Sequence, residues 1–143
     1  MIENGIEIPD KTINEKIVFT IKLNVITTTR FNYQKNTELL IPIITYLKEK
    51  KEADNFHFFI LGNSEEEKQF ISKIEELNLK EHFTLFGFTE EKEKYYLKSF
   101  CYISTSRWEG LSLAILEAMS YGIPVIATNV VGNRDIIIHN ENG

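Results

Sequence analysis

Residues 101–128, CYISTSRWEGLSLAILEAMSYGIPVIAT, contain two strand-like runs on either side of one helix-like run. The apolar run Cys101–Ser104 predicts a buried strand, and the run Val125–Ala127 predicts a second, shorter one. Between them, apolar residues dominate a helical segment over about 112–121, which Gly122 terminates. Two strands joined through a helix predict parallel neighbours in an α/β sheet.

The same alternation extends back along the chain. Further apolar runs that suit strands lie, in chain order, at 23–29, 56–61, 83–86 and 136–138. Helical spacing of apolar residues is found at 40–50, 65–77 and 90–98. Ser64 and Thr89 are predicted to cap two of these helices, whereas Pro42 predicts that the first one begins late or kinks. The sequence therefore predicts a doubly wound parallel sheet, Rossmann-like, with helices on both faces.

Size and charge narrow the class of protein. The chain has 143 residues, which suits one domain, and a net charge of −5, which argues against a nucleic-acid partner. No apolar stretch reaches the ~20 residues of a membrane-spanning helix, and the N-terminus lacks the pattern of a secretory signal. We therefore expect a cytoplasmic protein with no transmembrane segment, at most peripheral to the inner face of the membrane. Cys101 lies in an apolar run and is expected to be buried and inert.

Two loops are the candidates for a binding site, because ligands of open parallel sheets bind at the carboxyl ends of the strands. The loop 29–36 carries two cations, Arg30 and Lys35, and the loop 104–110 ends on Gly110. Gly110 allows a ligand to approach the backbone, and the start of the following helix offers free N–H groups that favour phosphate. Arg30, as a bidentate donor, and Lys35, as a point charge, are placed to bind the same phosphate.

Glu117 stands out because the helix around it is apolar on all sides, the pattern of a buried helix. A buried carboxylate is costly unless it is paired or hydrogen-bonded. Two interpretations stay open. Glu117 forms a structural ion pair or backbone contact within the protein, or it accepts hydrogen bonds from the hydroxyl groups of a ligand.

The sequence lacks the motifs of several other classes of binding site and enzyme. The chain contains no G-x-G-x-x-G, Walker A or D-x-D motif, and its three histidines show no ligand spacing, so we expect no metal. Glu109 and Glu117 do not suggest a glycosidase. On one continuous helix they would be separated by about 12 Å of rise, whereas paired glycosidase carboxylates lie roughly 5–9.5 Å apart.

Residues 109–125, EGLSLAILEAMSYGIPV, resemble the E-x7-E signature of retaining glycosyltransferases with the GT-B fold, most closely glycosyltransferase family four (group 1). The likeness covers essentially the whole chain in order. Its other matching positions are Arg30, Lys35, the strand-end glycines Gly62 and Gly87, the linker-like stretch 4–7 and the turn 131–135. Mild departures, where the family commonly has glycine, are Thr29, Asn36, Ser64 and Val131.

The resemblance implies roles for the acidic residues. Glu117 would accept hydrogen bonds from the ribose hydroxyls of a nucleotide-diphosphate sugar, and Glu109 would hold hydroxyls of the transferred sugar. The loop after Gly87 would face the base. The partner of Glu117 would then be the donor substrate.

The resemblance also implies a diphosphate site. The backbone N–H groups of Gly110, Leu111 and Ser112 would bind the diphosphate together with Arg30 and Lys35. These groups would stabilise the negative charge that develops as the nucleotide leaves. Glu109, Arg30 and Lys35 would thus be the catalytic residues, and no metal or other cofactor would be needed.

Finally, the resemblance implies the C-terminal, donor-binding half of a GT-B enzyme. Residues 1–14 would be a remnant of the interdomain linker, and 15–143 an incomplete nucleotide-sugar-binding domain, truncated at its C-terminal end. A glycan or glycolipid acceptor would bind through an N-terminal domain, so the chain alone is expected to transfer no sugar. A non-catalytic nucleotide-diphosphate-binding module is the alternative, and the E-x7-E block disfavours a nucleotide-sugar epimerase of the same fold.

Overall fold

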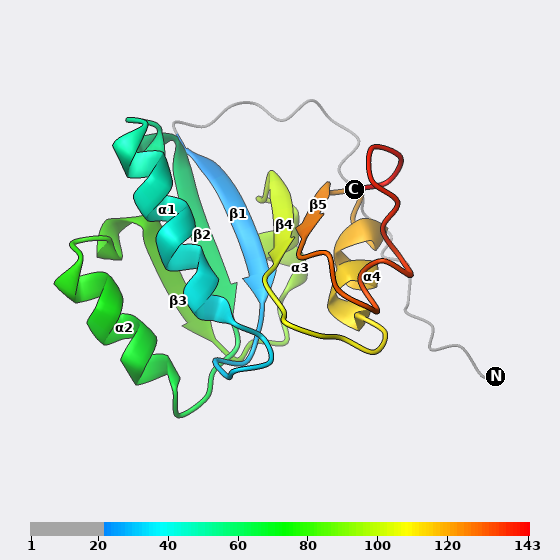
Figure 1. Cartoon of the computed structure of the whole chain (residues 1–143), viewed down its shortest axis with the longest axis horizontal. Helices are drawn as coiled ribbons and strands as arrows, with labels where there is room; N and C mark the ends of the chain where they lie inside the picture. The colour runs from blue at the N-terminus through cyan, green and yellow to red at the C-terminus, as the bar shows by residue number, and fades with distance from the viewer. Residues whose placement is uncertain (1–21) are drawn as a thin grey trace.

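One parallel sheet organises the protein, and the computed structural model describes it over residues 22–143 (Figure 1). The strand order is β3-β2-β1-β4-β5. The strands are β1 Leu23–Thr28, β2 Phe56–Leu61, β3 Phe83–Gly87, β4 Cys101–Ser104 and β5 Val125–Ala127. The order changes direction between β1 and β4, and in such folds this switch point is where ligands bind.

The sequence located these five strands closely. Three agree with their predicted bounds, β1 ends one residue earlier, at Thr28, and β3 continues to Gly87. The predicted strand at 136–138 is wrong, because local hydrogen bonds use its amides. The N–H groups of Ile136 and Ile137 donate to the Asn133 carbonyl, at 3.1 and 2.8 Å. The predicted linker, 1–14, lies outside the described residues.

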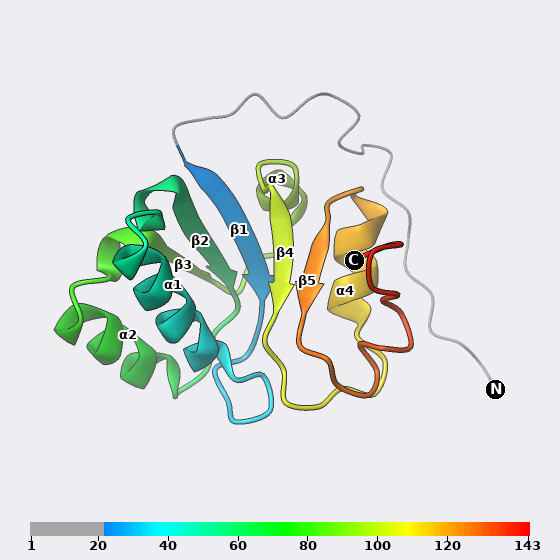
Figure 2. The same cartoon turned by 45° about the horizontal axis from the view of Figure 1, so that its top comes forward.

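Helices cover both faces of the sheet, as predicted (Figures 1 and 2). Their bounds are α1 Leu40–Glu49, α2 Glu67–Glu76, α3 Glu93–Tyr96 and α4 Leu113–Ser120. Because neighbouring strand residues point to opposite faces, Val25 joins the core beneath α1 and α2, whereas Ile26 joins the core with α3 and α4. The sheet therefore separates two apolar layers.

The helix boundaries differ from the predictions in their details. Pro42 falls in the first turn of α1, where the N–H that it lacks would have no partner within the helix. Ser64 does not cap α2. Its hydroxyl donates to the Phe31 carbonyl, at 2.8 Å, and the helix begins at Glu67. The Thr89 hydroxyl accepts the Glu91 N–H at 3.2 Å, but α3 is only one turn long.

Cys101 is buried on β4, as expected from its apolar surroundings. Burial raises the pKa of its thiol to about 11, because the thiolate would lose its hydration. The thiol therefore remains protonated at neutral pH and takes no part in the chemistry considered below.

Candidate functional site

The loops after β1 and β4 meet at the lower edge of the sheet in Figures 1 and 2, on either side of the switch point. Four hydrogen bonds to backbone carbonyls help to tie them together. The Thr105 hydroxyl donates to the Lys35 carbonyl at 2.8 Å, and the Arg107 N–H donates to the Gln34 carbonyl at 2.8 Å. Side-chain amides of Asn36 and Gln34 donate to backbone carbonyls of the second loop, at 3.3 and 3.2 Å. The two loops therefore form one connected structure.

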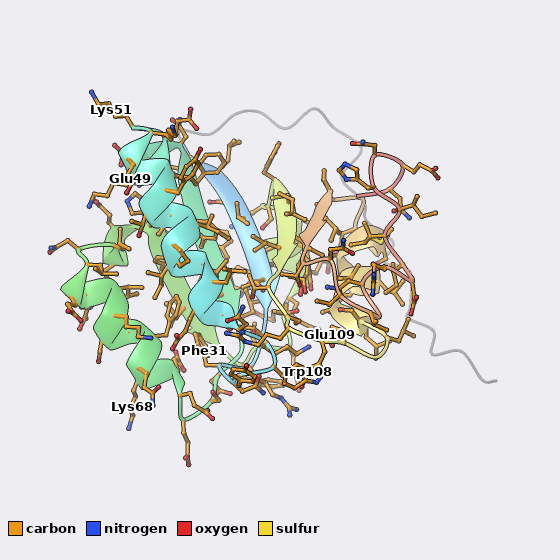
Figure 3. All side chains as sticks on the ribbon, in the orientation of Figure 1. Phe31, Glu49, Lys51, Lys68, Trp108 and Glu109 are labelled. Atoms are coloured by element: carbon orange, nitrogen blue, oxygen red, sulfur yellow. The ribbon has the colours of Figure 1, made fainter. Side chains whose placement is uncertain are left out.

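This connection brings two of the predicted catalytic residues into contact. The Lys35 ammonium lies 2.6 Å from a carboxylate oxygen of Glu109, and the Ser106 hydroxyl donates to the same oxygen at 2.6 Å. The Glu109 side chain is only 8% exposed and Lys35 27%. Figure 3 shows Glu109 at this edge of the sheet. The pair is one unit: a ligand that binds either charge has to compete with the other.

The space on the inner side of this ion pair is too small for a substrate. Thr27, Ser104 and Ser112, with Lys35 and Glu109, contribute to the lining of a recess of about 10 Å³, which holds at most one water. A sugar or phosphate therefore has to approach from the open side of the loops. The resemblance matched the stretch 104–106 to the serine that precedes the family's motif, but gave Ser106 no role as a partner of Glu109.

A third loop, after β5, packs against the backbone of Glu109 and Gly110. Gly132 has a φ of +86°, and a β-carbon there would lie 2.1 Å from the Gly110 carbonyl oxygen and 2.6 Å from that of Glu109. The buried Asn133 side chain donates to the Thr128 carbonyl, at 3.0 Å, and so holds this turn. The resemblance marked the turn, and the structure adds its contact with the Glu109 backbone.

The remaining predicted phosphate ligands lie at the same edge. The exposed Arg30 side chain forms no hydrogen bond or ion pair with another residue in the part of the chain that the structure describes. Gly110 is also exposed, with open space where its β-carbon would be. Leu111 is exposed and Ser112, which precedes α4, is buried without capping the helix through its side chain. Phosphate binding by their backbone N–H groups stays a prediction.

Glu117 lies on α4 and Glu109 in the loop before it, as the site requires. The Lys92 ammonium lies 2.7 Å from the Glu117 carboxylate, and the Tyr96 hydroxyl donates to it at 3.3 Å. Of the two interpretations left open, the structure therefore shows the ion pair. No sequence pattern marked Lys92, which lies in a run of alternating charges, and a role for Glu117 in binding ribose stays a prediction.

The expectation that α4 is buried on all sides is wrong. Leu113 is 44% exposed, whereas Ile115 and Ala118 are fully buried against the sheet. A helix that covers the sheet on one side only leaves its other side to solvent, even when that side is apolar. The Glu117 side chain is accordingly 24% exposed. Its neighbour Tyr96 is buried, and this burial raises the pKa of the Tyr96 hydroxyl, with smaller contributions from Tyr102 and Glu117.

Gly62 directly follows β2 and Gly87 is the last residue of β3, and the two glycines lie side by side. The Gly62 N–H donates to the Gly87 carbonyl at 2.7 Å, and both residues have positive φ. A β-carbon on Gly62 would lie 1.9 Å from the Thr29 carbonyl oxygen, so this glycine allows the loop that carries Arg30 to pass closely. Gly87 precedes Phe88, which is largely exposed. That this loop faces a nucleotide base stays a prediction.

The described residues contain one group with the composition of a metal site, Asp54, Glu81 and His82. It lies just before β2 and β3, at the amino ends of the strands and thus opposite the loops described above. The expectation that no metal takes part at Glu109 stays a prediction. Within residues 22–143, the helices are too short or too polar to cross a membrane.

Comparison with known proteins identifies the family. The family described as glycosyl transferases group 1 matches residues 10–143. The amylovoran biosynthesis glycosyltransferase AmsD of Erwinia amylovora is 32% identical over 111 residues, which cover 77% of this chain and 30% of AmsD. This relative therefore extends well beyond the matched segment.

Solved structures agree with this assignment. The crystal structure of S. aureus TarM has a TM-score of 0.86 and 29% identity, over 99% of this chain and 28% of TarM. The pneumococcal O-GlcNAc transferase GtfA, in complex with UDP and GlcNAc, has a TM-score of 0.76 and 25% identity, over 93% of this chain and 26% of GtfA. The chain spans less than a third of the length of AmsD, TarM and GtfA. It belongs to the glycosyl transferases group 1 family, and its fold is that of the C-terminal domain of a GT-B glycosyltransferase.

Proposed function

We propose that this chain is the donor-binding part of a retaining glycosyltransferase. It would bind a nucleotide-diphosphate sugar, from which a hexose-type sugar is transferred to a glycan or glycolipid acceptor. The observation that carries the proposal is the Lys35–Glu109 pair, held between two tied loops at the switch point of the sheet. The GtfA structure contains UDP and GlcNAc, which makes UDP the first nucleotide to test here.

The diphosphate is the part of the donor that the cations suit. Arg30 has no competing partner among the described residues and presents a planar guanidinium. Lys35 is already held in place, and a diphosphate oxygen offers its ammonium an alternative to Glu109. With the amides of Gly110, Leu111 and Ser112, these cations would stabilise the charge on the leaving nucleotide without a metal.

The two glutamates suit the hydroxyl groups on either side of the diphosphate. When Lys35 turns to the phosphates, the Glu109 carboxylate gains free lone pairs for hydroxyls of the transferred sugar. Glu117 would exchange Lys92 for the ribose hydroxyls. The pair is partly buried, and because its outer side is open to solvent we expect this exchange to cost little more than an exposed ion pair contributes, about 0–1 kcal/mol.

Transfer requires more than donor binding. An acceptor has to be held against the anomeric carbon, and positioning of this kind lowers barriers by about 7–11 kcal/mol. We assign that task to an N-terminal acceptor domain of the whole protein, as in the sequence expectation. The 143 residues alone would bind donor and transfer no sugar at a measurable rate.

Thermal unfolding of the chain with UDP, UDP-sugars and uridine tests the proposal. UDP should raise the melting temperature, since a ligand at 100 times its Kd stabilises the folded state by about 2.7 kcal/mol. Uridine, which lacks the diphosphate, serves as the matched control and should have little effect. If no nucleotide diphosphate stabilises the chain, the proposal is wrong. The alternative, a non-catalytic module, predicts the same stabilisation but no sugar transfer when an acceptor domain is supplied separately.

A further inference from the structure

Two exposed aromatic rings lie together at the outer side of the tied loops. The rings of Tyr33 and Trp108 are 5.8 Å apart between centroids, tilted by 51°, and their residues are 71% and 49% exposed. The Arg107 guanidinium lies 4.3 Å from the Tyr33 ring centroid. We call these three residues the aromatic platform. Figure 3 shows Trp108 close to Glu109 at the carboxyl edge of the sheet.

The platform is held in place by hydrogen bonds. The Arg107 N–H donates to the Gln34 carbonyl at 2.8 Å, and its guanidinium donates to the Asn36 side chain at 3.0 Å. The Gln34 side chain in turn donates to the Trp108 carbonyl at 3.2 Å. Two large rings that are exposed in this way contribute little to the hydrophobic core. Their placement on a fixed backbone therefore suggests a role in binding.

The platform continues into a groove of mixed character. Tyr33 and Arg107 line this groove of about 230 Å³, below the ~300 Å³ at which sites for drug-sized ligands begin. The aromatic side chains of Phe31 and Phe70 also line it, together with polar side chains from Asn32, Asn36, Glu38, Glu66 and Gln69. A ligand that fits here has an apolar face and several hydrogen-bonding groups around its edge.

A pyranose ring has both properties, since one face presents C–H groups and the rim presents hydroxyls. We propose that the platform and groove bind one sugar ring of the acceptor saccharide, and so add a contact to those that the N-terminal acceptor domain would supply. This inference rests on the proposed function, because it takes Glu109 to hold the sugar of the donor. Trp108 directly precedes Glu109 in the chain, so a saccharide on the platform would lie on the loop that carries Glu109. Tyr33 and Trp108 are distinct from the residues assigned to the donor, which are Arg30, Lys35, Glu109, Glu117 and the backbone of 110–112.

Trp108 is the only tryptophan of the chain, so its fluorescence reports directly on the platform. The 143-residue chain is titrated with the methyl α-glycosides of glucose, galactose and N-acetylglucosamine, each with and without saturating UDP. At least one glycoside should change the fluorescence saturably in both conditions. Tyr33→Ala should weaken that glycoside by about five- to tenfold, the value of one aromatic contact, and leave UDP binding unchanged. Tyr46→Ala is the matched control, because Tyr46 is also an exposed tyrosine beside a cation, Lys50, but lies on α1.

The outcomes separate the two proposals. If UDP binds but none of the glycosides does, the platform proposal is wrong and the proposed function stands. Competition between glycoside and UDP, or loss of UDP affinity in Tyr33→Ala, assigns the platform to the donor and also overturns it. Glycoside binding that depends on Tyr33, in a chain that does not bind UDP, supports the platform and contradicts the proposed function. If neither ligand binds, both proposals fail.

Discussion

The two glutamates of the E-x7-E motif have contrasting surroundings. Glu109 is 8% exposed and bonded to Lys35 and Ser106, inside a structure built from three loops. Glu117 is 24% exposed and bonded to Lys92 and Tyr96 on the side of a short helix. Both carboxylates have a lysine partner within hydrogen-bonding distance. They differ in how firmly the surrounding backbone holds that partner.

This difference shows that one motif can serve two purposes. The Glu109 pair is part of what holds the loops after β1 and β4 together, so its loss should affect the fold as well as binding. The Glu117 pair is exposed on its outer side, and a ligand can replace its lysine at small cost. The contrast therefore predicts large effects on stability near Glu109 and effects mainly on ligand affinity near Glu117.

The largest effect is expected for Gly132→Ala, which acts on the backbone beneath Glu109. The new β-carbon would lie 2.1 Å from the Gly110 carbonyl oxygen in a conformation with positive φ, so we expect a loss of about 3 kcal/mol or more in unfolding free energy. Gly87→Ala is the control, with positive φ but open space, and should cost about 1–2 kcal/mol. Urea denaturation measures both. Equal losses would mean that the third loop does not support Glu109.

The next effect compares the two carboxylates directly. Glu109→Gln should lower the unfolding free energy by about 1.5–3 kcal/mol, because it removes a charged hydrogen bond inside the loops. Glu117→Gln should cost about 0.2–1 kcal/mol, the value of an exposed ion pair. Chemical denaturation of the two variants at one salt concentration measures both losses in unfolding free energy. A larger loss for Glu117→Gln would reverse the comparison.

A smaller effect is expected for Lys92→Ala, measured as UDP affinity by calorimetry. Removing Lys92 frees the Glu117 carboxylate for the ribose, so binding should strengthen by about two- to fivefold. Lys80→Ala, which removes an exposed lysine paired with Glu75, should leave the affinity unchanged. Weaker binding in Lys92→Ala would show that this lysine itself contacts the nucleotide.

The smallest effect lies far from both carboxylates, at His57 on β2. Burial, then the charge of Lys22, lowers the pKa of this imidazole below its ordinary value of 6.5. The unfolded chain therefore binds the proton more readily, and stability should fall as the pH is lowered from about 7 to about 5.5. His57→Gln should show a shallower fall over this interval. An unchanged pH dependence would indicate that other groups determine it.

The sequence predicted the fold because its strands are strongly apolar and two of them, β2 and β3, end beside or at a glycine, Gly62 and Gly87. It failed where hydrogen bonds went to partners other than the expected ones. Ser64 bonds to the Phe31 carbonyl instead of its own helix, and the segment 136–138 satisfies its amides within turns. The first partner is distant in sequence and the second is local, and the spacing of apolar residues indicates neither.

The candidate site was predicted unevenly for the same reason. Both loops were expected at the carboxyl ends of the strands, which placed Lys35 and Glu109 at one edge of the sheet, but their ion pair was not predicted. The apolar sequence around Glu117 suggested burial on all sides, yet only Ile115 and Ala118 are enclosed. The ion pair with Lys92 joins two helices whose relative position is a tertiary property, and no local pattern encodes it.

Calorimetric titration of UDP into the 143-residue chain tests the central claim most directly, with Arg30→Ala and Glu117→Gln beside the exposed control Glu75→Gln. Arg30 and Glu117 should each contribute a charged hydrogen bond, so either substitution should cost about 1.5–3 kcal/mol, at least tenfold in Kd. Glu75→Gln should bind like the unchanged chain, because its carboxylate pairs with the exposed Lys80 and belongs to none of the loops of the candidate site. Equal affinities across all four proteins would contradict a donor site at the carboxyl edge of the sheet.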